Sequence, residues 1–289
     1  MPEPSESAAD ALDALDPSEA LAMLEWQIEL GADETILDAP VDRYEAAARA
    51  PARPAQAAPG GSGVGAGQGD AGQGGAAAAG APAPDPRAEV VEAARQAAGA
   101  AGDLDGLRAA VSAFEGCDLK KGARSTVFAD GDPAARVMII GEAPGVDEDR
   151  EGRPFVGRAG KLLDAMFDAI GLSRGAGGAA EALYITNVVP WRPPANRTPD
   201  AGEIACMLPF LERHVALAAP ELVVVMGNTA CQGVLGRQGI SRIRGAWSQA
   251  WGRPVLPMFH PAYLLRQPHA KRHAWADLLT LRARLDGGA

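Results

Sequence analysis

The chain has 289 residues and a formal net charge of −10, a length that allows one large domain or two small ones. No run of eighteen apolar residues occurs, which argues against a membrane-spanning helix. The acidic first twenty residues lack the basic start and apolar stretch of a signal peptide, and three cysteines cannot make a disulfide framework, so we expect a cytoplasmic protein.

The charge is unevenly distributed along the chain. Residues 1–106 hold 5 Lys and Arg against 19 Asp and Glu, whereas residues 107–289 hold 22 against 18. An acidic segment therefore precedes a mildly basic one, and only the second is suited to approach a polyanion.

Residues 1–50 are expected to form an acidic unit with one helix. Within them, Ser18–Leu30 places Leu21, Leu24, Trp26, Ile28 and Leu30 among acidic residues, a pattern that predicts an amphipathic helix capped by Ser18. Such a helix either folds back on the main domain or docks on a partner protein. Both readings stay open, because an isolated helix of this length is marginal in water.

Residues 51–86 are rich in Ala, Gly and Pro and contain one large aliphatic residue, Val64. This composition predicts a disordered linker, since it cannot bury enough apolar surface to offset the entropy of ordering. Residues 87–106 are compatible with a short helix that leads into the domain at 107–289.

From residue 107 onward, short apolar runs alternate with helical stretches. The runs have strand length and are rich in β-branched residues, and they cover 136–141, 183–188, 222–227 and 255–259. Helical stretches cover 159–171, 202–218, 228–235 and 271–285. This alternation predicts an α/β fold with three α/β/α layers and a central, mainly parallel four-stranded sheet. In such sheets ligands bind at the carboxyl ends of the strands.

The first of these strands runs into Gly141–Asp149, a glycine-rich turn with several carboxylates. It contains Glu142 and Glu148, which are candidates for acid–base work, although solvated acids on an ordinary strand–helix turn are the simpler reading. It is not a phosphate loop, because it lacks the GKS or GKT sequence and its acids would repel phosphate.

Three further residues lie in or after the predicted strands. Phe155 lies between glycines, where its ring could stack on a flat ligand, although a core Phe is the commoner case. Asn187 is an amide in an apolar strand and must be hydrogen-bonded, either to a loop or to a ligand. His260 stands where the last strand ends, and a lone His is more often structural than catalytic.

The segment after His260 is apolar and basic, and we expect it to protrude as a wedge that opens stacked bases. It consists of Tyr263, Leu264, Leu265 and Arg266. Arg192 and Arg197 lie on a stiff loop with Trp191 and two prolines.

Four motifs occur in one order: VFADGDP, RVMIIGEAPGVDEDREGRPFVGRAGKLLD, YITNVVPWRPPANRTP and MFHPAYLLR. In this order they resemble the family 4, iron–sulfur type, uracil-DNA glycosylases over residues 114–285. A related branch uses a GEQPG turn and a basic insert to link covalently to DNA, but this chain has GEAPG and no such insert. The resemblance therefore implies a plain glycosylase that releases uracil and initiates base excision repair.

The resemblance also implies roles for individual residues. The candidate catalytic residues are Glu142, His260 and Glu148. Substrate binding is expected from Gly141, Ala143, Gly145, Phe155 and Asn187. Contacts with DNA, single- or double-stranded, are expected from Arg192, Arg197, Tyr263, Leu264, Leu265 and Arg266. The protein is expected to be a monomer.

The chain departs from this family at the ligands of its 4Fe–4S cluster. Cys117 matches one of four family cysteines, and Cys206 lies one residue from another. Phe114, Trp191 and Met207 stand at ligand positions. A cluster of this type needs four thiolates, so we expect neither a cluster nor another metal.

Two other functions remain open. One is a DNA-binding or regulatory protein on the same fold, without turnover. The other is a nucleotide-binding α/β protein, which the missing phosphate loop disfavours.

Overall fold

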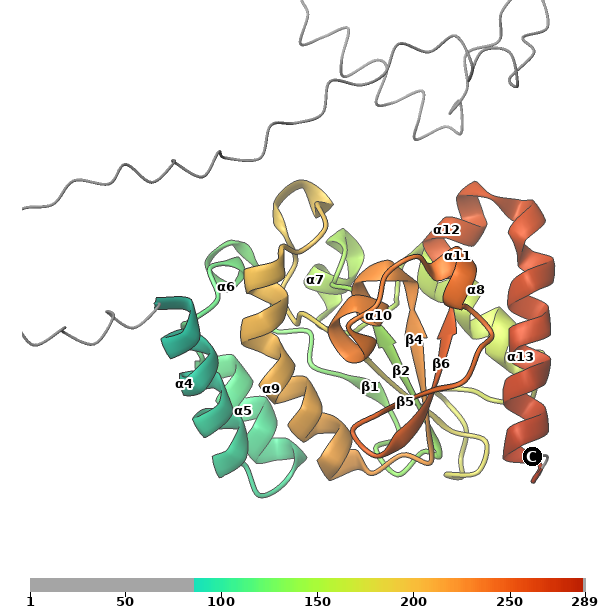
Figure 1. Cartoon of the computed structure of the whole chain (residues 1–289), viewed down its shortest axis with the longest axis horizontal. Helices are drawn as coiled ribbons and strands as arrows, with labels where there is room; N and C mark the ends of the chain where they lie inside the picture. Colours follow the sequence, from blue (N-terminus) through green and yellow to red (C-terminus); the bar gives the residue numbers. More distant parts are fainter. Residues whose placement is uncertain (1–85, 288–289) are drawn as a thin grey trace, which may run out of the picture. The chain divides into compact units, whose positions relative to one another are not determined.

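The computed structural model describes residues 86–287, and a single mixed sheet forms their centre (Figure 1). Its strand order is β1-β3-β2-β4-β6-β5. The central four strands are parallel: β2 Val137–Gly141, β3 Leu183–Asn187, β4 Leu222–Met226 and β6 Arg253–Met258. Two short antiparallel strands close the edges: β1 Asp130–Gly131 and β5 Ser248–Ala250.

Helices connect these strands in chain order. Before the sheet come α4 Pro86–Ala100, α5 Leu104–Ala113 and α6 Leu119–Gly122. The connections within the sheet carry α7 Val146–Glu151, α8 Arg158–Asp168, η1 Pro194–Asn196, α9 Ala201–Ala218, α10 Gly227–Leu235 and α11 Ile240–Ile243. The chain then continues through α12 Pro261–Arg266, η2 Pro268–Ala270 and α13 Lys271–Leu285.

The two faces of the sheet bury alternate residues of the same strands. In β2, Met138 and Ile140 pack with α5, α9 and α10, whereas Val137 and Ile139 pack with α8 and α13. This alternation follows from the pleat, which points successive side chains to opposite faces. Every residue of β2, β3 and β4 is buried, as expected for parallel strands covered on both sides (Figure 1). The three-layer α/β/α prediction is thus confirmed.

The four predicted strands match the four parallel strands of the sheet. The sheet is larger than predicted, since the edge strands β1 and β5 bring it to six. These strands span two and three residues, which is too short to show a periodic pattern.

The helix expected over 87–106 is in fact two helices, α4 and α5, and both pack on α9. The break falls at Asp103, where the backbone is extended. Its side-chain Oδ1 caps α5 by accepting a 2.7 Å hydrogen bond from the Gly106 N–H. The expected acidic helix at 18–30 and the linker at 51–86 lie outside the described residues, apart from the last residue of the linker, which begins α4. Among the described helices, none is both long enough and apolar enough to cross a membrane.

Candidate active site

The carboxyl ends of the parallel strands place the predicted polar residues at one edge of the sheet. Gly141 is the last residue of β2 and pairs in register with Asn187, the last residue of β3. Gly227 follows β4, and His260 lies two residues beyond β6. The strand order puts β2 between β3 and β4, so these residues lie on neighbouring strands.

Asn187 and Phe155 converge on Gly141. A Cβ atom at Gly141 would overlap the Asn187 Oδ1 atom and the edge of the Phe155 ring. Only a glycine therefore allows the amide and the ring to approach the sheet edge together.

The Phe155 ring stacks on the imidazole of His260, with 5.4 Å between ring centroids and 27° between planes. Phe155 is 5% exposed and His260 is partly exposed. The stack joins the loop after α7 to the end of the last parallel strand, so it links the two sides of the candidate site.

His260 has a defined tautomer in this arrangement. Its Nδ1 accepts a 3.1 Å hydrogen bond from the backbone N–H of Ala262, at the start of α12. The ring proton of the neutral form therefore resides on Nε2, which can donate. Burial, and secondarily the charge of Arg266, lowers the pKa of His260 to about 4, so the imidazole is neutral near pH 7.

Glu142 follows β2 directly and is partly buried. The hydroxyl of Thr229, on α10, donates a 2.5 Å hydrogen bond to its Oε2. Thr229 was not among the predicted site residues. It lies in the expected helix 228–235, and only its polar side chain beside the end of a strand distinguished it.

Glu148 has different surroundings. Its Oε2 accepts a hydrogen bond from the Gly145 N–H, and its Oε1 accepts from the N–H groups of Val156 and Gly157, all within 3.1 Å. Both carboxylate oxygens thus hold the turn after β2 against the loop that carries Phe155. Ala143, in the same turn, is partly buried.

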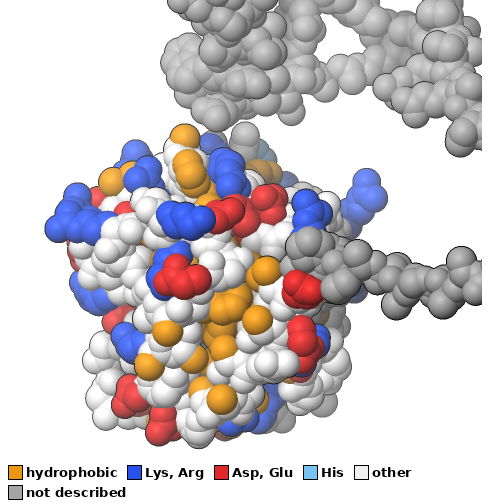
Figure 2. Space-filling model, turned by 90° about the vertical axis from the view of Figure 1, so that its left-hand side faces the viewer, with side chains coloured by type: hydrophobic (Ala, Val, Ile, Leu, Met, Phe, Trp, Pro, Cys, Tyr) orange, Lys and Arg blue, Asp and Glu red, His pale blue; other side chains and the backbone are white. Residues whose placement is uncertain are grey.

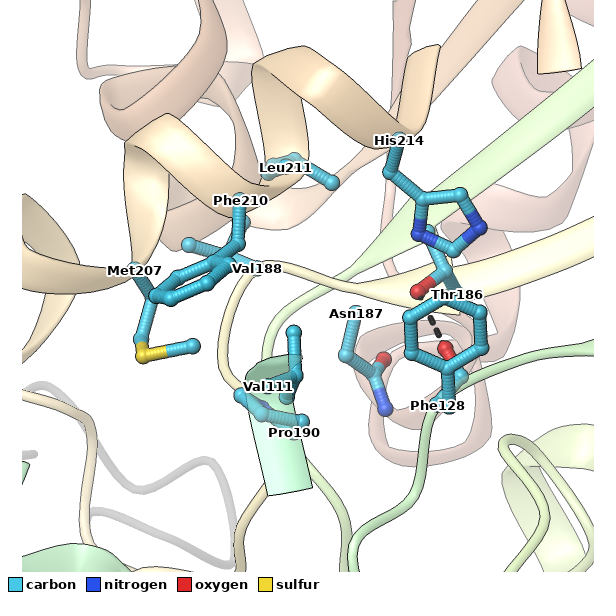
Figure 3. A pocket seen from close by; sticks show the side chains of 10 residues that line it. All are labelled: Val111, Phe128, Thr186, Asn187, Val188, Pro190, Met207, Phe210, Leu211 and His214. Carbon is cyan, nitrogen blue, oxygen red and sulfur yellow. Dashed lines mark hydrogen bonds between the residues drawn. The ribbon is translucent and has the colours of Figure 1, made fainter. Parts of the chain in front are cut away.

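Asn187 as a whole residue is 6% exposed, and its side-chain amide makes no hydrogen bond within residues 86–287. Its donor and acceptor are therefore available. Asn187 also lines a small cavity of about 20 Å³ between β3 and α9, where the Thr186 hydroxyl donates to the Phe128 carbonyl oxygen (Figure 3). That volume suits about one water molecule and not a base.

The expected DNA wedge is smaller than predicted. Its residues form helix α12, and Leu264 is fully buried in a cluster with Phe259, Ala270 and Ala274. The helical period turns Leu264 inward, while Leu265 and Arg266 remain exposed. Leu264 therefore cannot contact DNA in this conformation, which corrects that part of the prediction.

The two loop arginines have protein partners. Arg192 donates a 2.7 Å hydrogen bond to Asn196, and Arg197 forms a two-point ion pair with Glu203. Figure 2 shows Lys and Arg side chains, with Asp and Glu among them, along the upper part of one face, the end at which the strands of Figure 1 terminate.

The residues at the family's cluster positions fill an apolar core. Trp191 is 1% exposed, and its indole N–H donates to Thr126 Oγ1 at 3.1 Å. Phe114 meets the Phe210 ring edge-on at 5.1 Å. Met207 belongs to the same buried cluster.

Two cysteines remain in this region. Cys117 and Cys206 are buried, and hydrogen bonding to Cys117 followed by burial raises the pKa of Cys206. No three His, Cys, Asp or Glu side chains of the described part converge as metal ligands. The whole chain has three cysteines, so a cluster held by four does not fit.

Comparison with known proteins gives one consistent result. A family model described as the uracil DNA glycosylase superfamily matches residues 128–279. A type-4 uracil-DNA glycosylase of Sulfurisphaera tokodaii is 35% identical, over 62% of this chain and 83% of the relative. The enzymes of the same name from Archaeoglobus fulgidus and Thermotoga maritima are 36% and 39% identical, over 60% and 52% of this chain and 89% and 77% of the relatives.

Proposed function

The chain belongs to the uracil DNA glycosylase superfamily, and we propose that it hydrolyses the N-glycosidic bond of deoxyuridine in DNA, the first step of base excision repair. The observation that carries this proposal is the convergence of the Asn187 amide, the Phe155 ring and the His260 imidazole at the carboxyl edge of the sheet. Because the bond is shielded within stacked DNA, the nucleotide must be flipped out to reach these groups.

Asn187 is proposed to read the base. Uracil presents N3–H as a donor and O4 as an acceptor, and one amide can answer both with its oxygen and its NH₂. Cytosine presents the reversed pattern and is rejected. The available donor and acceptor of Asn187 support this role.

Phe155 is proposed to stack on the flipped base. The Phe155 ring and the Asn187 amide oxygen both lie against Gly141, so a base that is read by Asn187 would lie beside this ring.

His260 is proposed to stabilise the leaving group. The C1′–N1 bond breaks with its electron pair passing to uracil, which leaves an oxocarbenium-like sugar and a uracil anion. A donor at O2 lowers the barrier by stabilising that anion. The tautomer set by Ala262 and the lowered pKa supply a neutral imidazole that donates through Nε2.

Glu142 is proposed to orient the attacking water and to balance the positive sugar. Water forms the new bond to C1′ and gives up a proton to the carboxylate. Glu148 is the second candidate, but its oxygens accept three backbone N–H groups, and this favours Glu142.

The exposed part of α12 is proposed to meet the DNA. Leu265 is 36% exposed and can occupy the space left by the flipped nucleotide, with Tyr263 and Arg266 beside it. Arg192 and Arg197 would contact phosphates, although Arg197 must then share its charge with Glu203.

The protein is further proposed to work without an iron–sulfur cluster. Apolar packing around Trp191, Phe114 and Met207 occupies the region where the family's ligands lie, and two thiols remain there. No step of the proposed reaction depends on iron.

A direct assay tests the proposed function. Purified protein should release free uracil from uracil-containing single- and double-stranded DNA and leave an abasic site. Binding of the same DNA without release would instead support a regulatory protein on this fold.

A further inference from the structure

Phe155 has an unusual backbone for a bulky residue. Its φ angle is 54°, in the left-handed region that large side chains rarely adopt. A Cβ atom at Gly160 would overlap the Phe155 carbonyl oxygen, so close packing with α8 depends on that glycine. Such a conformation persists only where the surrounding structure imposes it.

Arg174 holds this part of the chain by two carbonyl groups. Its Nη1 donates to the Pro154 carbonyl oxygen and its Nη2 to that of Phe155, both at 2.9 Å. A planar guanidinium fixes the direction of each of its N–H groups, so two bonds from one fork fix the orientation of the peptide units they contact.

The guanidinium is itself held from two sides. Its Nη1 donates to Asp130 on β1 at 2.8 Å, and its Nε donates to Asp164 on α8 at 2.9 Å. The Arg174 side chain is 15% exposed. The backbone of the neighbouring Ser173 is bonded to Glu181 and Leu183, so the loop that carries Arg174 is closed against the start of β3.

We propose that Arg174 is a positioning residue for base recognition, which sets the plane of the Phe155 ring by holding the main chain at 154–155. This inference rests on the proposed function, because the ring matters only if it receives a base. Without the guanidinium, Phe155 relaxes out of the left-handed region and its ring leaves the sheet edge beside Asn187.

The effect should fall on binding more than on chemistry. Loss of a whole base–aromatic stack costs on the order of 5- to 150-fold in affinity, and a displaced ring costs part of that. We expect Arg174→Met to raise the half-saturating protein concentration in single-turnover uracil release by roughly tenfold. The maximal rate should change less. Arg174→Lys should be intermediate, since one ammonium cannot serve all four acceptors.

A double-mutant cycle with Phe155→Leu separates this role from general support of the fold. If Arg174 acts through the ring, Arg174→Met should change the half-saturating concentration little in the Phe155→Leu background, where the ring is absent. An equal effect in both backgrounds would overturn the inference. If the Met variant does not fold, the same cycle is measured with Arg174→Lys, which keeps a positive charge between the two aspartates.

Arg136→Met is the matched control. Arg136 also bonds a carboxylate and a carbonyl, those of Glu221 and Leu285, but at the amino end of β2. The Arg136→Met variant should leave the half-saturating protein concentration unchanged. A wild type that releases no uracil contradicts the proposed function and this inference with it, whereas an active wild type with additive variants contradicts the role of Arg174 alone.

Discussion

The hydroxyl of Thr229 donates a 2.5 Å hydrogen bond to Glu142 and so ties the start of α10 to the end of β2. This bond holds one oxygen of the Glu142 carboxylate in place, and the planar group therefore also sets the direction of the other oxygen. Thr229→Val keeps the shape but removes the donor. A hydrogen bond to a charged group contributes about 1.5–3 kcal/mol, so we expect single-turnover uracil release to slow by on the order of 10- to 100-fold.

Thr229→Ser is the control for this prediction, because it retains the hydroxyl and should retain most of the rate. Equal rates for the Val variant and the wild type would show that Glu142 needs no such partner.

The parallel sheet was predictable because its strands are buried on both faces and read as continuous apolar runs. The edge strands were not, since pairing with β3 and β6 creates them and no local pattern does. The two helices at the start of the described region were merged in the prediction, because Asp103 as a cap gives only a weak signal against an alanine-rich background.

The site was predictable to the extent that its residues follow strands. Asn187 and His260 stand at strand ends, and Phe155 lies between glycines. Thr229 and Arg174 act through contacts with residues 87 and 19 to 20 positions away, which no local pattern shows. The prediction for Leu264 was wrong because α12 turns this side chain inward. The segment was predicted as a protruding loop, and a loop prediction does not say which side chains of a helix face the core.

Purified anaerobically, the protein should be colourless and free of stoichiometric iron and sulfide. The reason is the chemistry of the side chains at the cluster positions, since Phe114 and Trp191 cannot ligate iron and the two remaining thiols are buried. Metal analysis with an absorption spectrum provides the measurement. A brown preparation with four iron atoms per chain would contradict it.

Acid should destabilise the fold through His214. This residue is buried against Phe128 and bonded to the Tyr184 hydroxyl, and burial lowers its pKa to about 3. Between about pH 6.5 and 3 the unfolded chain binds a proton that the folded chain does not, so stability falls as pH falls through that window. At pH 5 this amounts to about 2 kcal/mol.

His214→Gln keeps a partner for Tyr184 and removes this titration. Urea unfolding at pH 7.5 and pH 5 should show a smaller loss of stability in the variant than in the wild type. His260 contributes equally to both proteins, so the difference isolates His214. Identical pH dependence in the two proteins would contradict the prediction.

His260→Ala should slow uracil release without abolishing DNA binding. Loss of one donor to a developing anion typically costs on the order of a hundred- to a thousandfold in rate. Single-turnover release and DNA affinity measured on the same preparation separate the two effects. An unchanged rate would reassign His260 to capping α12, the role that its bond to Ala262 already shows.

Asn187→Asp gives the sharpest test of the site. The amide is the group beside Gly141 that can satisfy both uracil N3–H and O4, whereas an ionised carboxylate offers two acceptors and no donor. Uracil O4 would then face a carboxylate oxygen with no proton between them. A mismatched partner leaves buried polar groups unpaired, so we expect the variant to lose most uracil release.

The same substitution should bring a weaker gain on unpaired cytosine, because the N4–H₂ group of that base would find an acceptor. The gain is the smaller effect, since cytosine N3 matches a carboxylate only when a proton is shared between them. Single-turnover release of both bases from single-stranded DNA measures loss and gain together. Full uracil activity in the Asp variant would mean that Asn187 does not read the base, and the proposed pocket between Gly141, Phe155 and His260 would have to be placed elsewhere.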